Sequence, residues 1–311
     1  MYKGKRVSVV VPAYNVAPHI LEVLKTIPDF VDQTIVVDDC GSDATSTILA
    51  QVYDPRTTII RHETNQGVGG AMVSGFKRAL SDRADLVVKM DGDGQMDPGY
   101  LSALLDPLID EDISYTKGNR FLDSAKLQAM PALRLIGNYA LTFLTKWASG
   151  YWHIFDPQNG YIAIRSEALR KLDLDHIAKR YFFENDMLVH LNIFSVRMKD
   201  ISIPARYGNE KSSMKMHEIL LTFPWYLARR FWYRTYQKHI LRDFSPIALF
   251  WVFGTPMFLW GFLFGLYTWG ISIIFHKIAT TGTVMLSVLP FLLGFELILQ
   301  GMILEIKDSP R

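Results

Sequence analysis

Two aspartates in the first third of the chain, Asp91 and Asp93, have a spacing suited to metal chemistry. They come directly after an apolar run typical of a buried strand, Leu86 to Met90, and Gly92 and Gly94 allow the chain to turn there. The turn lets both carboxylates face the same space. Hard oxygen ligands of this kind suit Mg²⁺ or Mn²⁺ better than Zn²⁺. An ion held there would bridge the phosphates of a nucleotide and neutralise a diphosphate leaving group.

The glycine-rich segment from Asn65 to Ala71 matches neither of the common nucleotide-binding motifs. A dinucleotide fingerprint needs Gly or Ala where Met72 stands, and a P-loop needs lysine where Phe76 stands. The mismatch argues against a dinucleotide-dependent oxidoreductase. The glycines would still let a helix N-terminus approach either another chain segment or a diphosphate.

The elements that must position these residues alternate between strand and helix. The predicted order begins with a strand and ends with one, over residues 7–11, 20–27, 34–37, 45–53, 57–61, 70–80 and 86–90. Such alternation predicts a parallel sheet with right-handed crossovers, in which ligands bind at the carboxyl ends of the strands. The acidic pair Asp38 and Asp39 falls at such an end, as do Asp91 and Asp93.

The composition excludes several protein classes. The chain has 311 residues, of which 49% are hydrophobic and 21% charged, so it is neither disordered nor collagen-like. Its net charge of +2 argues against a nucleic-acid partner bound through bulk charge. The single cysteine, Cys40, cannot form a disulfide within the chain. The mean hydropathy of +0.11 is high for a soluble protein and points to membrane segments.

Two apolar runs near the C-terminal end are long enough to cross a bilayer. Phe244 to Phe275 contains no Asp, Glu, Lys or Arg, and a second run extends from Thr283 to Leu304 with Pro290 and Glu296 inside it. The short link between them predicts a hairpin. Lys and Arg gather before the first run and after the second, which predicts that both termini are cytoplasmic. The alternative is a pair of core helices in a soluble protein.

The stretch before the first run combines aromatic side chains with a basic cluster. This mixture predicts amphipathic helices on the membrane surface, and the alternative is an ordinary helix packed on the domain. We therefore expect a cytoplasmic domain, juxtamembrane helices, two transmembrane helices and a cytoplasmic tail, over residues 1–214, 215–243, 244–306 and 307–311.

Six motifs give the chain a resemblance to a known family. They are Val9 to Asn15, Val37 to Thr45, Asn65 to Ala71, Asp91 to Pro98, Gly118 to Arg120 and Asp156 to Tyr161. Their order and spacing resemble glycosyltransferase family 2, and in particular its membrane-anchored polyprenyl-phosphate glycosyltransferases, relatives of dolichyl-phosphate mannose synthase. Cys40-Gly41-Ser42 departs from the usual Gly-Ser-Thr of the family. The resemblance implies an α/β fold of the GT-A type: a Rossmann-like mixed sheet flanked by helices, followed by amphipathic interfacial helices and a two-helix transmembrane hairpin.

The resemblance also implies roles for particular residues. The nucleotide-sugar donor would be held by Pro12, Tyr14, Asn15, Asp38, Asp39, Asn65, Gly67, Asp91 and Gly92. The Mg²⁺ or Mn²⁺ cofactor would be bound by Asp91, Asp93 and Gln95. The candidate catalytic residues are Asp93, Asp156 near the sugar and acceptor, and Asp186. The segment Phe183 to Asp186 resembles the Glu-Asp pair that acts as catalytic base in family members, with an Asn inserted between the two acids. The alternatives are an Asx turn for Asp156 and a surface helix start for Asp186.

The acceptor decides whether a catalytic base is needed. A sugar hydroxyl must lose its proton to a carboxylate. A lipid phosphate, with a second pKa of about 6, is already largely dianionic at neutral pH and needs cations instead. The candidate groups for that phosphate are Arg120, Arg134, Arg206, Lys211 and Ser212. The alternative for the last three is a solvated basic loop.

The combined prediction is inverting transfer of one sugar from a UDP- or GDP-linked donor to a polyprenyl phosphate on the cytoplasmic leaflet. The alternatives are transfer to a hydroxyl of a glycolipid or polysaccharide precursor, and a non-catalytic membrane scaffold. A homo-oligomer formed through the membrane helices is compatible with the sequence, although no residue demonstrates it.

Overall fold

The computed structural model describes residues 1–120, 132–204 and 216–310 of the chain. It divides into two compact units. The N-terminal unit comprises Met1–Phe231 with Pro310–Arg311, and the C-terminal unit comprises Trp232–Ser309.

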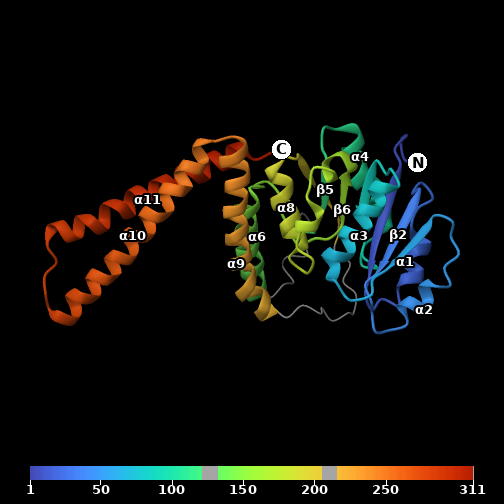
Figure 1. The fold of residues 1–311 in the computed structure, drawn as a ribbon, viewed down its shortest axis with the longest axis horizontal. Helices are drawn as coiled ribbons and strands as arrows, with labels where there is room; N and C mark the ends of the chain where they lie inside the picture. Colours follow the sequence, from blue (N-terminus) through green and yellow to red (C-terminus); the bar gives the residue numbers. More distant parts are fainter. Residues whose placement is uncertain (121–131, 205–215, 311) are drawn as a thin grey trace. The chain divides into compact units, whose positions relative to one another are not determined.

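The N-terminal unit is built on a seven-stranded sheet in the order β3-β2-β1-β4-β6-β5-β7 (Figure 1). The strands are β1 Val7–Ala13, β2 Gln33–Asp38, β3 Thr57–Arg61, β4 Leu86–Lys89, β5 Tyr115–Asn119, β6 Ile162–Arg165 and β7 Met198–Ser202. Strands β1 to β4 pair in parallel, as the alternation predicts, and β6 runs antiparallel to both β4 and β5. The sheet is therefore mixed, as the family resemblance implies. The carboxyl ends of β4 and β5 lie at the same edge, because both oppose β6.

Helices cover both faces of this sheet. The helices of this part of the chain are α1 Ile20–Thr26, α2 Thr45–Leu49, α3 Gly67–Ser81, η1 Pro98–Tyr100, α4 Leu101–Asp110, α6 Ala132–Ser149, α7 Ser166–Leu169, η2 Leu174–His176, α8 Phe183–Ile193 and α9 Met216–Arg234. One core joins β1 to α1, α2 and α4, for example Val9 with Leu104. The other joins β1 to α3 and α8, for example Val10 with Phe76. Successive residues of β1 thus enter opposite cores, which explains its unbroken apolar run.

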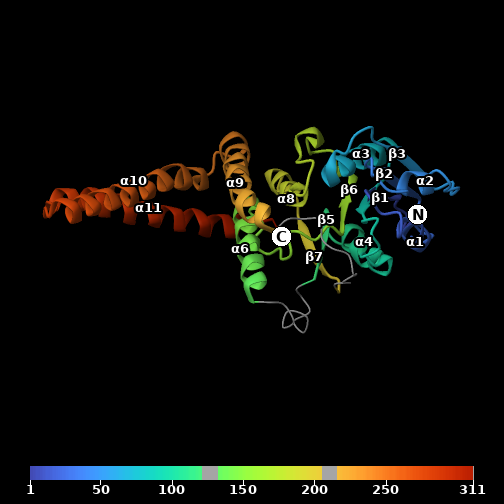
Figure 2. The same ribbon diagram turned by 90° about the horizontal axis from the view of Figure 1, so that it is seen from below.

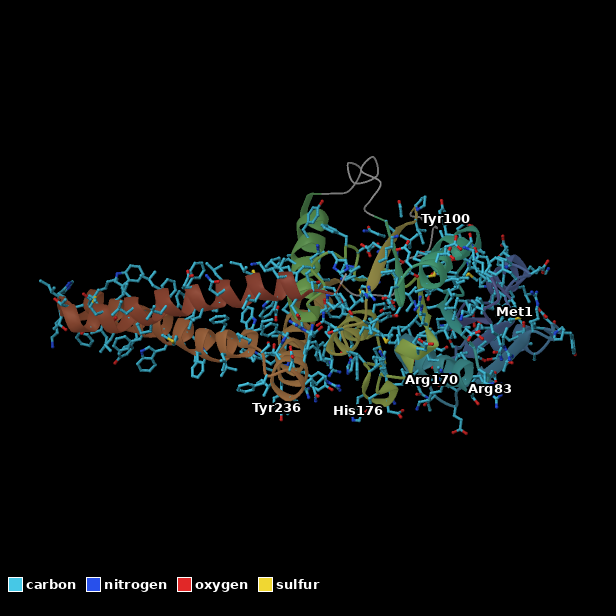
Figure 3. All side chains as sticks on the ribbon, turned by 90° about the horizontal axis from the view of Figure 1, so that it is seen from above. Met1, Arg83, Tyr100, Arg170, His176 and Tyr236 are labelled. Carbon is cyan, nitrogen blue, oxygen red and sulfur yellow. The ribbon has the colours of Figure 1, made fainter. Side chains whose placement is uncertain are left out.

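The C-terminal unit contains two long helices joined by a short link. After a π-helix at Thr235–Arg242, the helices are α10 Pro246–Phe275 and α11 Thr281–Asp308. They run side by side in both views (Figure 2), and their sticks are almost entirely carbon (Figure 3). Both are long and apolar enough to cross a membrane. Helix α11 extends past the predicted run at both ends, because it begins at Thr281 and continues through Lys307 to Asp308.

Small residues let the two helices approach closely. The position of a Cβ on Gly254 would lie 2.9 Å from Leu297 Cβ, and one on Gly294 would lie 2.8 Å from Gly254 O. At the open end of the hairpin, Arg234 Nη2 lies 2.9 Å from Glu305 Oε1 and Lys238 Nζ lies 2.8 Å from Asp308 Oδ2. The close backbone contact at Gly254 and Gly294 is of the kind that favours helix pairing in lipid.

Candidate active site

The carboxyl end of β4 carries a buried charge cluster around Lys89. The Lys89 side chain is 1% exposed, and its Nζ lies 2.7 Å from Asp91 Oδ1 and 3.3 Å from Glu184 Oε1. Burial on its own lowers the pKa of Lys89, but attraction to Asp91 and Glu184 outweighs burial and raises the pKa above its ordinary value. The lysine therefore stays charged and joins β4 to the first turn of α8.

Neither Lys89 nor Glu184 of this cluster was among the residues selected from the sequence. Asp186 was selected instead, because its segment resembles the Glu-Asp pair that serves as catalytic base in the family. A helix advances about 100° per residue, so two residues two positions apart face different directions. Glu184 faces the strand ends, and Asp186 faces away from them toward α9.

The loop after Asp91 folds as a turn that is held by local hydrogen bonds. Asp93 Oδ1 accepts a hydrogen bond of 3.0 Å from the Gln95 backbone N–H, and the Asp91 backbone N–H donates to Met96 Sδ at 3.2 Å. Gly92 is buried, and a Cβ there would lie 3.2 Å from Pro12 O. The Asp-x-Asp segment is thereby packed against the end of β1.

The side-chain ligands available here suit a hard divalent cation whose coordination shell is completed by substrate. In residues 1–120, 132–204 and 216–310 no group of three or more His, Cys, Asp and Glu side chains is arranged to hold a metal. Asp91 and Asp93 offer carboxylate oxygens and Gln95 an amide oxygen, all within one turn. Mg²⁺ is commonly bound by one or two carboxylates together with substrate phosphates, so these residues fit such an ion.

Asp39 binds the glycine-rich turn that begins α3. Its carboxylate is buried and accepts hydrogen bonds from the backbone N–H groups of Gln66, at 2.9 Å, and Gly67, at 2.7 Å. His62 Nδ1 lies 2.7 Å from Asp39 Oδ1, and His62 Nε2 lies 2.8 Å from Ser74 Oγ. Asp39 therefore fixes the loop beside the predicted nucleotide site.

The glycines of this turn approach another segment of the chain, which is the first of the two expected alternatives. The Gly70 backbone N–H donates to Lys179 O at 3.0 Å. A Cβ on Gly69 would overlap Ala178 O and lie 2.9 Å from Phe183 Cβ. The turn thus packs against the chain that leads into α8.

The other predicted donor-binding residues lie at or shortly after the carboxyl ends of β1, β2 and β3. Tyr14 is 50% exposed, and Asn65 is exposed as well. Asn15 has φ +53°, and its Oδ1 accepts a hydrogen bond of 2.8 Å from the Ser42 backbone N–H. Asp38 is buried, with its Oδ2 2.5 Å from Ser46 Oγ.

Asp156 forms a bidentate ion pair with Arg120 at the end of β5. Arg120 Nε lies 2.7 Å from Asp156 Oδ2 and its Nη2 lies 2.8 Å from Asp156 Oδ1. The Asp156 side chain is 2% exposed and that of Arg120 is 40% exposed. The pair therefore holds a partly exposed arginine at the edge of the sheet where Asp91 lies. Asp156 has φ +50°, which suits the turn expected there.

The loop from Asp156 to Gly160 links the two charge clusters. A Cβ on Gly160 would overlap Lys89 Nζ and lie 3.2 Å from Asp91 Oδ2. The Asn159 carbonyl accepts a hydrogen bond from the buried ammonium of Lys117. Burial lowers the pKa of Lys117 to about 8, although Asp156, Glu184 and Asp200 each act to raise it.

Asp200 on β7 completes the acidic surroundings of Lys117. Its Oδ2 accepts hydrogen bonds from the Phe155 backbone N–H at 2.7 Å and from Asn119 Nδ2 at 2.8 Å. Burial raises the pKa of Asp200 to about 6, despite both hydrogen bonds. No signal in the sequence identified this aspartate, because its partners come from β5 and from the loop after α6.

Asp186 lies inside the domain instead of at a surface helix start. Helix α8 does begin at Phe183, but the Asp186 side chain is fully buried against Arg230 of α9. Asp186 lies outside the cluster around Asp91, although Glu184 of the same helix belongs to that cluster. Three predicted acceptor residues, Arg206, Lys211 and Ser212, lie outside the described residues, as does the side chain of Arg134.

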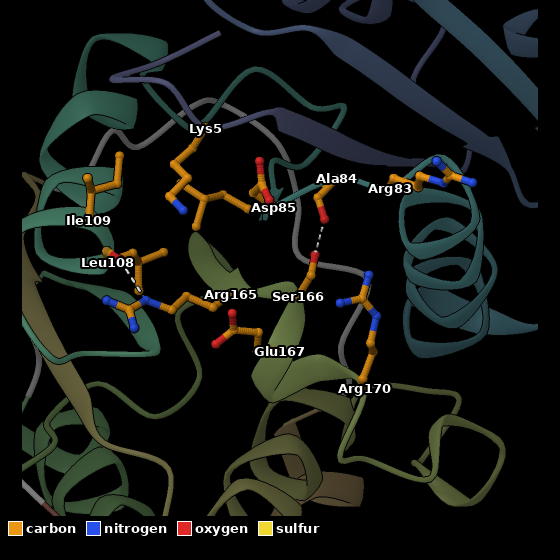
Figure 4. A pocket seen from close by; sticks show the side chains of 11 residues that line it. Lys5, Arg83, Ala84, Asp85, Leu108, Ile109, Arg165, Ser166, Glu167 and Arg170 are labelled. Atoms are coloured by element: carbon orange, nitrogen blue, oxygen red, sulfur yellow. Dashed lines mark hydrogen bonds between the residues drawn. The ribbon is translucent and has the colours of Figure 1, made fainter.

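A cavity of about 490 Å³ lies at the opposite edge of the sheet (Figure 4). It is lined by the amino end of β4, the end of β6 and α7, with Arg83, Arg165 and Arg170 around it. Arg165 Nε donates to Leu108 O at 2.6 Å, so this arginine supports the wall. None of the residues selected from the sequence lines this cavity.

Comparison with known proteins identifies the family. The sequence model of glycosyl transferase family 2 matches residues 8–173. This range includes all six motifs that carry the family resemblance, and it ends before the segment Phe183 to Asp186. The chain belongs to this family. It is therefore a glycosyltransferase, and the seven-stranded mixed sheet is the GT-A fold of these enzymes.

Several relatives act on lipid phosphates, according to their names. The chain is 31% identical over 217 residues to UDP-N-acetylglucosamine–dolichyl-phosphate N-acetylglucosaminyltransferase of Methanococcus voltae, covering 63% of this chain and 86% of that one. It is 30% identical over 203 residues to undecaprenyl-phosphate mannosyltransferase of Micrococcus luteus, covering 64% and 82%. The fold is similar to glucosyl-3-phosphoglycerate synthase of Mycobacterium tuberculosis, solved with Mn²⁺, UDP-glucose and phosphoglyceric acid. That match has a TM-score of 0.52 and 20% identity, and covers 74% and 80% of the two chains.

Proposed function

We propose that the protein transfers a single sugar, with inversion, from a nucleotide-sugar to a polyprenyl phosphate on the cytoplasmic leaflet of a membrane. The observation that carries the proposal is the placement of two charge clusters at one sheet edge. Asp91 lies at the end of β4, and the Arg120–Asp156 pair lies at the end of β5, joined through the loop that ends at Gly160. The names of the relatives and the two long apolar helices support a lipid acceptor.

The donor is assigned to the side of the site near β1 and β2. Asp39 holds the glycine-rich turn, while Tyr14, Asn15 and Asn65 offer exposed groups to the nucleoside. Asp91, Asp93 and Gln95 would hold Mg²⁺ or Mn²⁺, which when bound neutralises charge on the departing diphosphate. The Lys89 ammonium holds the Asp91 carboxylate in place, so that this carboxylate does not have to be ordered again on binding.

The acceptor phosphate is assigned to Arg120. Its guanidinium is oriented by Asp156 and its side chain is 40% exposed, which leaves room for a phosphate to approach from solvent. An oxygen of that phosphate attacks the anomeric carbon as the bond from this carbon to the diphosphate oxygen breaks. The dianionic phosphate needs no base for this step.

A transfer assay on the full chain in detergent tests the proposal. The donors are UDP- and GDP-linked sugars with Mg²⁺ or Mn²⁺. The acceptors are undecaprenyl or dolichyl phosphate, with the same polyprenols lacking phosphate as the matched control. The expected result is a lipid-phosphate-linked sugar from the phosphates alone, detected by mass spectrometry. Transfer to the polyprenols that lack phosphate would overturn the lipid-phosphate assignment.

A hydroxyl acceptor is the second candidate function, and the position of Glu184 favours it. The Glu184 side chain is 13% exposed and lies in the cluster around Asp91, where a base would have to be. In that reaction the hydroxyl proton would pass to Glu184. Glu184→Gln would then abolish transfer, with a loss that added base does not restore.

A further inference from the structure

Arg230 is the one arginine of α9 that pairs with Asp186 among the described residues. Arg230 Nε lies 2.6 Å from Asp186 Oδ1, and Arg230 Nη2 donates to Asp186 Oδ2 at 2.8 Å. Asp186 is 0% exposed, whereas Arg230 is 23% exposed. A buried carboxylate requires such a partner, because an unpaired charge there is strongly unfavourable.

The same carboxylate ties the chain before α8 to the helix. Asp186 Oδ2 also accepts a hydrogen bond of 2.7 Å from the Ala178 backbone N–H. One residue further on, the carbonyl of Lys179 accepts the hydrogen bond from Gly70. The segment leading into α8 is thus held by Asp186 on one side and by the glycine-rich turn on the other.

The first turn of α8 depends on these outside contacts for its position. Its N-cap residue, Phe182, has no polar side chain to accept the free backbone N–H groups of that turn. Phe182 instead packs on Phe223 and Tyr226 of α9, with ring centroids 5.4 and 5.5 Å away. Contacts with α9 therefore fix the N-terminal end of α8, both through aromatic rings and through Arg230.

Glu184 lies in this same turn, two residues before Asp186, and points the other way. Its Oε1 is 3.3 Å from Lys89 Nζ, which in turn holds Asp91. A shift of the turn by less than a bond length would change both distances. The helix turn thus carries one carboxylate for α9 and one for the catalytic cluster.

We infer that Arg230 is a positioning residue, which acts through Asp186 to set Glu184 and Lys89 against Asp91. The inference rests on the proposed function for the identity of the reaction. Helix α9, which continues directly into the chain of the C-terminal unit, would then help to position the catalytic cluster.

The neighbouring arginine provides a matched control for the test. Arg229 is on the same helix and exposed, so Arg229→Gln removes the same charge without touching Asp186. Arg230→Gln is expected to lower kcat by about 10- to 100-fold, as a small misplacement of catalytic groups does. The KM for the nucleotide-sugar should change less than kcat, because Asp39 still holds the glycine-rich turn on the donor side of the site. Arg229→Gln should retain the kcat of the wild type.

A double-mutant cycle separates positioning from general damage to the fold. If Arg230 acts through Glu184, Arg230→Gln should cost little further activity in a Glu184→Gln background. Arg230→Lys, which keeps the charge but replaces the planar guanidinium with a single ammonium, should recover part of kcat. If Arg230→Gln is too unstable to purify, Asp186→Asn with Arg230→Gln removes both charges and leaves amides that can still bond; it should be stable yet reduced in kcat.

Three outcomes would overturn the inference. They are equal kcat for Arg230→Gln and Arg229→Gln, a full additional loss in the Glu184→Gln background, or a stable Asp186→Asn/Arg230→Gln protein with wild-type kcat. Each is measured on whichever acceptor the wild-type chain uses. A wild-type chain that ignores lipid phosphate and transfers to a hydroxyl would therefore refute the proposed function. The inference would then be decided by the kcat of Arg230→Gln against that of Arg229→Gln.

Discussion

Gly160 packs so closely on Lys89 that no side chain fits between them. A Cβ on Gly160 would overlap Lys89 Nζ and would also lie 3.2 Å from Asp91 Oδ2. The loop that carries Asp156 is therefore in direct contact with the residue that holds Asp91. This contact makes one site from the two charge clusters at the ends of β4 and β5.

Gly160→Ala should reduce activity by displacing Lys89. The ammonium can move, but only by lengthening its 2.7 Å contact with Asp91. We expect kcat to fall by about tenfold, the scale of a modest misplacement of catalytic groups. The control is Gly137→Ala in α6, where a Cβ would meet nothing within 4 Å. Since alanine favours helix, this control should keep full activity, and equal losses in the two variants would contradict the argument.

Asp93→Asn should abolish most of the metal-dependent turnover. The substitution keeps an oxygen but removes the charge that a divalent ion requires, and a fall in kcat of about 100-fold or more is expected. Asp97→Asn is the matched control, because Asp97 Oδ1 accepts from the Gly99 backbone N–H and asparagine can do the same. Turnover is measured over a titration of Mn²⁺. An Asp93→Asn enzyme with an unchanged Mn²⁺ response would remove Asp93 from the metal site.

The strands near the site could be predicted because burial on both faces leaves a direct mark on the sequence. Strand β3 has the predicted bounds Thr57–Arg61, and β1, β2 and β4 differ from prediction by no more than two residues at an end. Helix α2 ends at Leu49, short of the predicted Tyr53, which is 94% exposed and so contributes nothing to a buried face. Spacing alone did not reveal that the helix stops there.

The contacts that organise the site could not be predicted, because each joins residues that are distant in sequence. Lys89 meets Glu184, and Asp186 meets Arg230, across different elements. The sequence motif around Asp186 indicated that an acid of this segment matters. Which acid faces the strand ends depends on how α8 is rotated, and that is set by packing against α3 and α9.

Asp200→Asn should stabilise the protein at neutral pH and not in acid. Burial raises the pKa of Asp200 to about 6 in the folded chain, above the ordinary value of 3.8. The protonated form is thus favoured by folding, and its stabilising effect is lost as the pH rises from about 4 to 6. Asparagine keeps an oxygen for the Phe155 backbone N–H and carries no charge.

The size of this effect follows from the pKa shift. The difference in free energy of unfolding at pH 7.5 should be on the order of 2 kcal/mol, reduced by the partial exposure of the group. Thermal unfolding in detergent should therefore show a higher Tm for Asp200→Asn at pH 7.5, a smaller difference at pH 4.5, and a difference near zero only at about pH 3, below the ordinary pKa of an aspartate. Asp29→Asn, at a fully exposed aspartate, is the control and should show no pH-dependent difference. A variant that is less stable than wild type at pH 7.5 would contradict the assignment.

Gly261→Ala should weaken the pairing of α10 and α11. A Cβ there would overlap Phe291 N and lie 2.6 Å from Ser287 O, and both are backbone atoms that cannot move without moving the helix. The same close approach lets Ser287 Oγ donate to Gly261 O at 2.9 Å, so separating the helices also lengthens a hydrogen bond. Overpacking of this kind costs about 1–3 kcal/mol. The control is Gly270→Ala on the same helix, where a Cβ would meet nothing within 4 Å. Unfolding by SDS in mixed micelles should occur at lower SDS for Gly261→Ala than for wild type, and at unchanged or higher SDS for Gly270→Ala. Identical curves for the two variants would mean that the helices do not pack at Gly261.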